Sequence, residues 1–459
     1  MISIPHTKFV KILRIKFYAF TLLSCAALCL SLFTAESAHA QSCPAADADD
    51  GATDSTITLD SGGTETWTPA DSTAFDCSSL SLHVTNSTTL AIDQDPTNGW
   101  AGEMQFVNVT VDVGSKIEAD SEGCTTDEGP NSSTNVCEDN TTAGEEASNT
   151  GAGGGHGGNG GTGSQANSDG GVYHGNISGP VEFGAGGGSS QGSNGGTGGG
   201  VIHITASGNL ANNGTISANG GDGTVTSGTE VGGGGAGGSV YADIGGTLSG
   251  SGNFEATGGN GADSTWDGGG GSGGIIYIIF DITSIGVAIG SQLDPSGGTG
   301  GGIGTAGDDG SAILKDNTLN DVYFLEGNSY ASHARTSGFC SGGTCAFNDF
   351  TINSGAMMKF EYNSGYADDT SITVADDLTV NGTLNIGHDV TNGYLYSITV
   401  TDDVTVGAAG AIRSDAEGCG TDVAPNSTTN ACEDNSSAGV EHANSGGGGG
   451  HGGEGGAGS

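Results

Sequence analysis

Short β-type runs recur at a nearly constant spacing, and this limits the folds that the chain can adopt. Residues 199–223 align with residues 237–261 at an offset of 38, and residues 273–300 follow 36 residues later. Each copy holds two short runs, such as Val201–Thr205 and Gly214–Ala218, and the first alternates apolar and polar residues as a half-buried strand does. One pair of such strands cannot bury its apolar face, whereas stacked copies can. The repeat therefore predicts an all-β solenoid with one continuous core.

A longer repeat surrounds the short one. Residues 117–164 begin IEADSEGCTTDEGPNSSTNVCEDN, and residues 412–459 begin IRSDAEGCGTDVAPNSTTNACEDN, at an offset of 295 without a gap. Upstream, residues 107–117 resemble residues 402–412 at the same offset. We therefore expect a unit of about 295 residues that begins a second time, and a chain that is a fragment of a longer tandem array.

Glycine makes up 91 of the 459 residues, without the Gly-X-Y period of collagen. So much glycine makes long helices costly. The Gly-rich stretches could be flexible linkers. Because they recur at fixed places between the strand runs, we instead expect ordered loops or a layer where backbones approach closely, since no Cβ intervenes.

The first 40 residues have the order of a secretory signal peptide. Residues 1–16 are basic, residues 17–33 are mostly apolar, and Ala38-His39-Ala40 offers small residues before a cleavage site. A retained membrane anchor is the alternative reading, and a lipoprotein signal ending at Cys25 fits less well because the apolar residues continue beyond it. We expect a secreted or cell-surface protein with no membrane span in the mature chain.

The rest of the chain is strongly acidic. Residues 41–459 carry 52 acids and 5 bases, a net charge of −47. Phosphate backbones and anionic membranes repel such a chain, which argues against nucleic-acid binding.

Eight cysteines remain after the signal, an even number that is typical of disulfides in an exported protein. Zinc is the competing reading, but the 12-residue gap between Cys124 and Cys137 does not fit zinc spacing. Pairing of sequence neighbours is the simplest connectivity. The pairs would be Cys43–Cys77, Cys124–Cys137, Cys340–Cys345 and Cys419–Cys432.

The strings GGGHGGNGG, GGTGGGVIHI, GGGGAGGSV and GGGGSGGIIYI follow one another between about residues 150 and 320. This order resembles the glycine-rich parallel β-helix repeats of large bacterial surface and exported proteins, loosely called adhesin-like or autotransporter-passenger-like. The resemblance implies an all-β, right-handed parallel β-helix with glycine-rich loops. The expected divisions are a signal peptide (1–40), an N-terminal β segment or cap (41–105), a glycine-rich repeat unit (106–330), a connecting β segment (331–395) and a truncated second copy (396–459).

Acidic residues surround the Cys124–Cys137 loop and recur in the second copy. Carboxylate and amide oxygens are the ligands that Ca²⁺ prefers, so the loop is a candidate calcium site, although no cofactor is required. A solvated acidic loop closed by a disulfide is the alternative. The candidate ligands are Asp120, Glu122, Asp127, Glu138 and Asp139, and Asp415, Glu417, Asp422, Glu433 and Asp434 in the second copy. His156 and His451 lie within glycine runs, where we expect exposed polar side chains.

No catalytic residues stand out. Parallel β-helices host polysaccharide lyases and hydrolases, but those use clustered acids with a basic residue nearby, and the five bases here are scattered. An ice-binding surface would need regular Thr-x-Thr ladders, which are absent. We expect a non-catalytic, adhesin-like structural repeat protein whose partners are extracellular glycans, matrix or other cells. A polysaccharide-active enzyme or carbohydrate-binding module on the same scaffold is the alternative.

Overall fold

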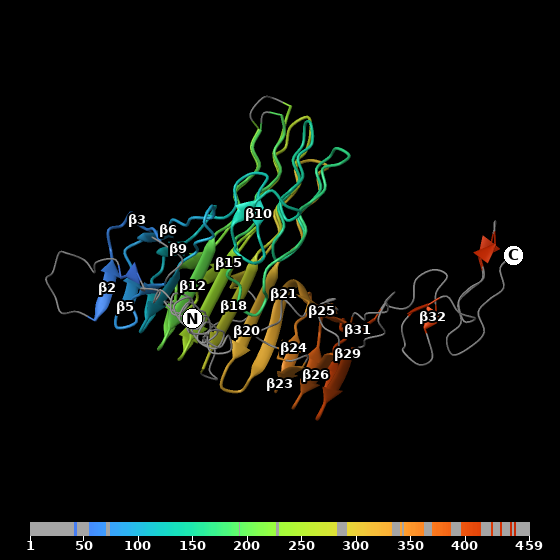
Figure 1. Cartoon of the computed structure of the whole chain (residues 1–459). Helices are drawn as coiled ribbons and strands as arrows, with labels where there is room; N and C mark the ends of the chain where they lie inside the picture. The colour runs from blue at the N-terminus through green and yellow to red at the C-terminus, as the bar shows by residue number, and fades with distance from the viewer. Residues whose placement is uncertain are drawn as a thin grey trace, which may run out of the picture. The chain divides into compact units, whose positions relative to one another are not determined.

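The computed structural model describes residues 41–43, 55–69, 74–191, 193–225, 229–281, 292–332, 340–341, 344–361, 370–386, 396–414, 424–425, 432–433, 441–442 and 445–446. Within these residues every regular element is a β-strand and no helix occurs (Figure 1). The all-β prediction is therefore confirmed. Contacts group Ser42–Ser459 into one compact unit, which is the part described below. The expected signal peptide lies outside the described residues.

The largest sheet, sheet I, has 14 strands. Its N-terminal strands are β1 (Gln41–Ser42), β4 (Phe75–Asp76), β7 (Glu103–Phe106), β12 (Val201–Ala206), β15 (Ser239–Ile244), β18 (Ile275–Phe280) and β20 (Ser311–Asp316). Its C-terminal strands are β21 (Asp321–Ser332), β24 (Phe350–Ile352), β25 (Met357–Glu361), β27 (Leu378–Val380), β28 (Thr383–Ile386), β30 (Val404–Val406) and β31 (Ala411–Arg413).

Three smaller sheets accompany sheet I, and their strands are parallel except for β22 (Cys340–Ser341). Sheet II contains β2 (Thr56–Leu59), β5 (Ser81–Val84), β8 (Val109–Val111), β13 (Leu210–Asn212) and β16 (Leu248–Ser249). Sheet III contains β3 (Thr64–Trp67), β6 (Thr89–Ile92), β9 (Lys116–Glu118), β14 (Thr215–Ser217), β17 (Asn253–Glu255) and β19 (Leu293–Asp294). Sheet IV contains β22 (Cys340–Ser341), β23 (Thr344–Phe347), β26 (Thr370–Val374) and β29 (Tyr396–Val400), with β22 antiparallel to β23.

Three short antiparallel pairs complete the described strands. They are β10 (Gly129–Pro130) with β11 (Cys137–Glu138), β32 (Ala424–Pro425) with β33 (Cys432–Glu433), and β34 (Glu441–His442) with β35 (Ser445–Gly446).

Equivalent strands of successive repeats pair in parallel and in register. Val201 lies opposite Ser239, Ser239 opposite Ile275, and Ile275 opposite Ser311. These steps of 38, 36 and 36 residues include the offsets by which the sequence repeats. Because side chains alternate between the two faces of a strand, this register places like residues in columns, such as Ile204, Ala242 and Ile278.

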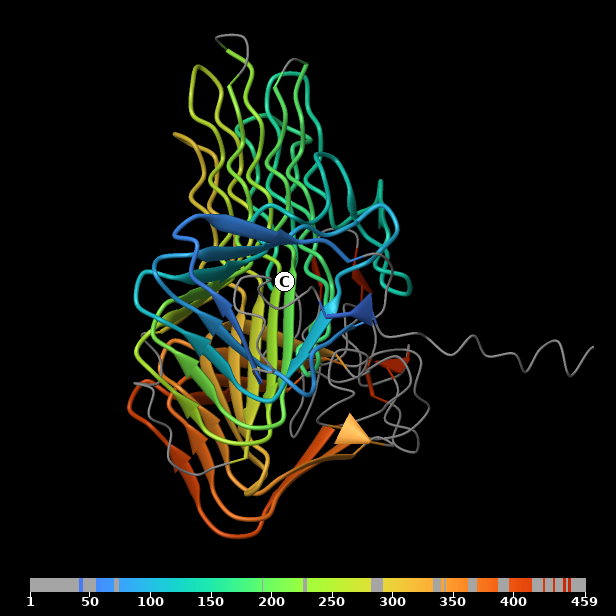
Figure 2. The ribbon, with the colours of Figure 1, turned by 90° about the vertical axis from the view of Figure 1, so that its left-hand side faces the viewer.

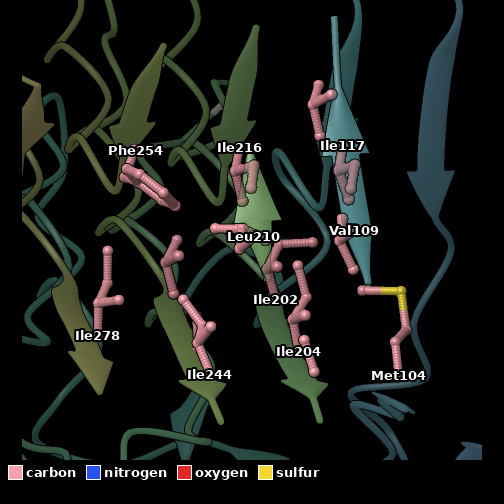
Figure 3. Close-up of a cluster of buried hydrophobic side chains, with 14 of the residues drawn as sticks. Met104, Val109, Ile117, Ile202, Ile204, Leu210, Ile216, Ile244, Phe254 and Ile278 are labelled. Carbon is pink, nitrogen blue, oxygen red and sulfur yellow. The ribbon is translucent and has the colours of Figure 1, made fainter. Parts of the chain in front are cut away.

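One continuous hydrophobic column was expected, but the two large hydrophobic clusters lie on opposite faces of sheet I, and a small third cluster contains Cys124, Phe183 and Val201. In β18, Ile276 and Ile278 belong to the first cluster, which lies between sheets I, II and III (Figure 3). Ile275 and Tyr277 alternate with them and belong to the second cluster, together with Phe324. The apolar run IIYIIF is typical of a strand that is covered on both faces.

The two large clusters lie on different faces of sheet I because the chain reverses its direction between β20 and β21. β20 and β21 form an antiparallel hairpin, after which β24, β27 and β30 continue parallel to β21. The side chain of Asp316 accepts hydrogen bonds from the backbone N–H groups of Thr318 and Leu319 and so stabilises the turn. Asn320, with a φ of 58°, completes the turn in the left-handed region that Asn tolerates. We call the strands before the hairpin the first region and those after it the second region.

The glycine-rich loops form an ordered layer that extends together from one side of the strands (Figures 1 and 2). Hydrogen bonds join the loops at every third residue: Gly196 N donates to Gly233 O and Gly199 N donates to Ala236 O. A three-residue repeat is that of polyproline II, whereas a β-sheet would repeat every two residues. We call this layer the glycine bundle. It consists of residues 151–163, 184–188, 195–200, 220–223, 232–238, 258–261, 268–274, 297–300 and 304–310.

Glycine is required in the bundle for space. None of the bundle glycines has a positive φ. A Cβ added to most of them would overlap the backbone of a neighbouring segment; at Gly271 it would overlap the carbonyl of Gly235. The expected close approach of backbones is thereby confirmed.

The longer repeat is visible in the strands. β8 and β9 recur as β30 and β31, and β10 and β11 recur as β32 and β33, each at the offset of 295 residues. The β10–β11 register, with Gly129 opposite Glu138, is also reproduced by Ala424 opposite Glu433.

Candidate functional site

Two of the predicted disulfides are formed. Cys43 and Cys77 are bonded with their Cα atoms 5.1 Å apart, and Cys124 and Cys137 with theirs 5.4 Å apart. Cys345 is also disulfide-bonded, and the residue opposite it in the β22–β23 pair is Cys340. The fourth predicted pair is not seen, because Cys419 and the side chain of Cys432 lie outside the described residues.

The first candidate calcium ligand is held by other groups. The carboxylate of Asp120 lies 2.5 Å from Lys116 Nζ, which also lies 2.7 Å from Glu118. Burial of Lys116 opposes its charge, but the two carboxylates outweigh that effect and raise the pKa of the lysine. The other oxygen of Asp120 accepts hydrogen bonds from Ser217 Oγ at 2.7 Å and from Asn219 N at 2.8 Å. Asp120 therefore joins sheet III to the following loop.

The other candidate ligands of the first copy point to different partners. Asp127 accepts a hydrogen bond from the backbone of Ser189 at 2.6 Å, and Glu138 accepts one from Asn131 at 2.7 Å. Burial raises the pKa of the Glu122 carboxyl. Asp139 is exposed.

These five carboxylates do not form a common site. Among the described His, Cys, Asp and Glu side chains, no group of three with ligand atoms within 4.8 Å of one another includes any of them. In the second copy, four of the candidates lie outside the described residues: Asp415, Glu417, Asp422 and Asp434. The side chain of Glu433 lies outside them as well. Calcium binding by this loop stays a prediction.

A column of aspartates runs along the turns of the second region, just before β24, β27 and β30. The carboxylate in one turn accepts a hydrogen bond from the backbone N–H of the aspartate in the next turn, at 3.2, 2.9 and 3.1 Å. Each side chain thus links two consecutive turns. The column consists of Asp321, Asp349, Asp377 and Asp403.

A group of three exposed acids shares Asp377 with this column. Carboxylate oxygens of Asp376, Asp377 and Asp402 lie within 4.8 Å of one another, and no other such group of three occurs among the described residues. Exposed acids at this spacing are common in proteins without an ion, so the group defines a negatively charged edge of the second region. In the sequence, the Asp-Asp pairs at 376–377 and 402–403 precede strand runs, and such pairs suit turns.

His156 is fully buried, and the expectation of an exposed side chain is wrong. Its backbone N–H donates to Ser272 Oγ at 2.8 Å, and its ring Nδ1 lies 2.8 Å from Gly237 O. The ring also packs against that of His174 in a tilted arrangement, with centroids 4.6 Å apart. His156 therefore ties the bundle to the loops around it. His451 lies outside the described residues.

A shallow groove of about 600 Å³ lies on the outer face of sheet II. Eight of its eleven lining residues carry hydroxyl, amide or imidazole groups, and they include the half-buried Thr110 at the centre of β8. His83 at the same face lies 2.9 Å from the carboxylate of Asp112. A hydrogen bond from Thr85, together with His83, lowers the pKa of Asp112. The groove residues are Thr56, Ser81, Leu82, His83, Asn108, Val109, Thr110, Asn209, Ala211, Thr247 and Ser249.

Comparisons with protein-family models, with curated proteins and with solved structures find no match to this chain. Within the described residues, no helix has the length and the apolar character needed to cross a membrane.

Proposed function

We propose that this chain is a non-catalytic, exported structural protein of the adhesin-like type, built as a right-handed parallel β-helix. The observation that carries the proposal is the parallel register between repeats. Each of β12, β15 and β18 pairs with its counterpart in the next repeat, over six residues in each step. Stacked coils of this kind gain stability from each neighbour, and such a protein acts through repetition and an extended surface.

Export is supported by three features. The signal-like order of residues 1–40, the two disulfides and the net charge of −47 after residue 40 all suit an extracellular protein. A secreted or cell-surface location follows from this proposal. Mass spectrometry of the secreted protein would test it, because cleavage after Ala40 leaves Gln41 as the first residue.

Extracellular glycans are the partners that the groove on sheet II suits best. Threonine, serine and asparagine side chains can donate and accept hydrogen bonds with sugar hydroxyls. The groove is shallow and open, and it resembles a binding face more than an enclosed catalytic cleft. The alternative, a polysaccharide-active enzyme or carbohydrate-binding module, uses the same face.

A glycan array with the full chain tests this assignment. Thr110→Trp fills the groove and should weaken binding, whereas the matched control Thr215→Trp changes a half-buried threonine on sheet III and should leave binding unchanged. A parallel screen for reducing ends released from acidic and neutral polysaccharides should be negative. Release of oligosaccharides would refute the structural proposal and support the enzymatic alternative. If no glycan on the array binds, glycans are not the partners of this chain.

A further inference from the structure

The end of the stack at β30 and β31 exposes side chains that a β-solenoid normally buries. β30 pairs with β27, and β31 pairs with β28, and within the described residues neither has a partner on its other edge. Val404, Val406 and Ile412 are 52%, 47% and 45% exposed. An edge that combines open backbone groups with apolar side chains is prone to pair with another strand.

The first copy of the long repeat shows what covers the same strands. Val109, Val111 and Ile117 are the counterparts at the offset of 295, and they are 1%, 0% and 0% exposed. β13 lies in parallel beside β8, with Leu210 opposite Val109, and β14 lies beside β9, with Ile216 opposite Ile117. Figure 3 shows these four side chains packed together. The partner of this surface is thus a coil with one apolar residue in each of two short strands.

We propose that the open edge of β30 and β31 is a strand-acceptor site. It binds, by parallel strand addition, a coil with the sequence pattern of residues 199–219. β30 has the same sequence as β8, Val-Thr-Val, so the backbone register and the apolar contacts of the first copy can be repeated. A leucine of the incoming coil then covers Val404, and an isoleucine covers Ile412.

The opposite end of the described stack does not offer such a surface. The inward side chains of β2 and β3 are covered, since Ile57, Leu59 and Trp67 are 1%, 6% and 6% exposed. End-to-end docking of a second copy through β2 and β3 would therefore bring no apolar side chains to Val404 and Ile412. A further coil of the repeat is the occupant that matches them.

A synthetic peptide of residues 199–219 with a fluorescent label provides the probe, and fluorescence anisotropy with the full chain provides the readout. We expect saturable binding that Val404→Asp weakens at least tenfold, because the carboxylate would be buried against apolar side chains. Val113→Asp is the matched control, since Val113 is 78% exposed and lies outside the edge, and it should leave binding unchanged. A peptide with Leu210→Asp and Ile216→Asp should not bind.

Three outcomes would overturn the proposal. The first is that the peptide does not bind, and the second is that Val113→Asp and Val404→Asp affect binding equally. The third is that sedimentation shows the chain dimerising through this edge, with Val404→Asp abolishing the dimer and the peptide failing to compete. The inference rests on the stacked-coil architecture of the proposed function but not on glycan binding, so a negative glycan array would leave it intact.

Discussion

A single methyl group in the glycine bundle should destabilise the protein strongly. Gly271 stands in a column with Gly235 before it and Gly307 after it, at steps of 36 residues. A Cβ on Gly271 would overlap the carbonyl of Gly235 and lie 3.0 Å from Ala236 N. Both obstacles are backbone atoms, so no side chain can rotate away, and two segments must separate.

The hydrogen bonds at the two segments set the size of the effect. Gly271 N donates to Gly259 O at 2.9 Å, and Gly298 N donates to Gly271 O at 2.8 Å. Gly235 accepts from Gly259 N at 2.8 Å and donates to Gly221 O at 2.9 Å. At about 1 kcal/mol for each bond, loss of these four bonds costs about 4 kcal/mol, a large share of the stability of a folded domain.

Urea denaturation of Gly271→Ala, followed by circular dichroism, measures this cost. Gly63→Ala is the matched control, because a Cβ on Gly63 has only Ser61 Oγ nearby, at 3.9 Å, and its φ is not positive. We expect the control to be neutral or stabilised by up to about 1 kcal/mol, since alanine restricts the unfolded chain. Equal stability of Gly271→Ala and Gly63→Ala would refute the view that the bundle is close-packed.

Three further predictions concern the strands and their turns. Replacing Cys43 and Cys77 together by serine should lower the free energy of unfolding by about 4 kcal/mol, because their sequence separation is 34; an unchanged urea midpoint would contradict this. Burial raises the pKa of Tyr241 to about 12, so the folded protein holds that proton where the unfolded chain loses it. Stability should therefore fall as the pH rises from 10 to 12, and Tyr241→Phe should flatten the fall; an equal slope in both proteins would count against it. Asp402→Asn should raise the melting temperature at low salt by relieving repulsion from Asp376, and the gain should shrink at 1 M NaCl; a gain that salt leaves unchanged would point to another cause.

Local repetition allowed much of the strand pattern to be predicted. The expected run Val201–Thr205 corresponds to β12, and the expected run Gly214–Ala218 contains β14. The offset of 38 between copies became the register in which Val201 faces Ser239. These features could be predicted because a strand and its partner carry the same alternation of apolar and polar residues, and the spacing alone sets the pairing.

Other features depended on contacts that no local pattern encodes. The reversal at β20 and β21 puts the second core on the other face of sheet I, and a short turn at Asp316 and Asn320 causes it. The burial of His156 arises because glycine segments surround it. A glycine run has no side chains to mark its inner and outer faces, so the sequence around His156 predicted exposure. The candidate calcium ligands were chosen as acids that flank the Cys124–Cys137 loop and recur in the second copy. Distant partners such as Ser217 and Asn219, which bond to Asp120, could not be read from that local pattern.

Successive repeats are separated by the same distance in the glycine bundle as in the sheets, and this couples the stability of the two parts. Four of the bundle segments lead directly into a strand of sheet I, at Gly200, Gly238, Gly274 and Gly310. At these junctions Ser239 N donates to Gly200 O, Ile275 N to Gly238 O, and Ser311 N to Gly274 O, at 3.0, 3.0 and 2.9 Å. The glycines at these junctions also lie very close to one another. A Cβ added to Gly238 would overlap the carbonyl of Gly200, one on Gly274 that of Gly238, and one on Gly310 that of Gly274. Because neighbouring strands lie only about 4.8 Å apart, segments that continue from them stay that close, and only glycine allows further layers of backbone to fit beside them. A wider bundle would pull the strands of sheet I out of register, so the glycine runs are as necessary to this fold as the apolar columns.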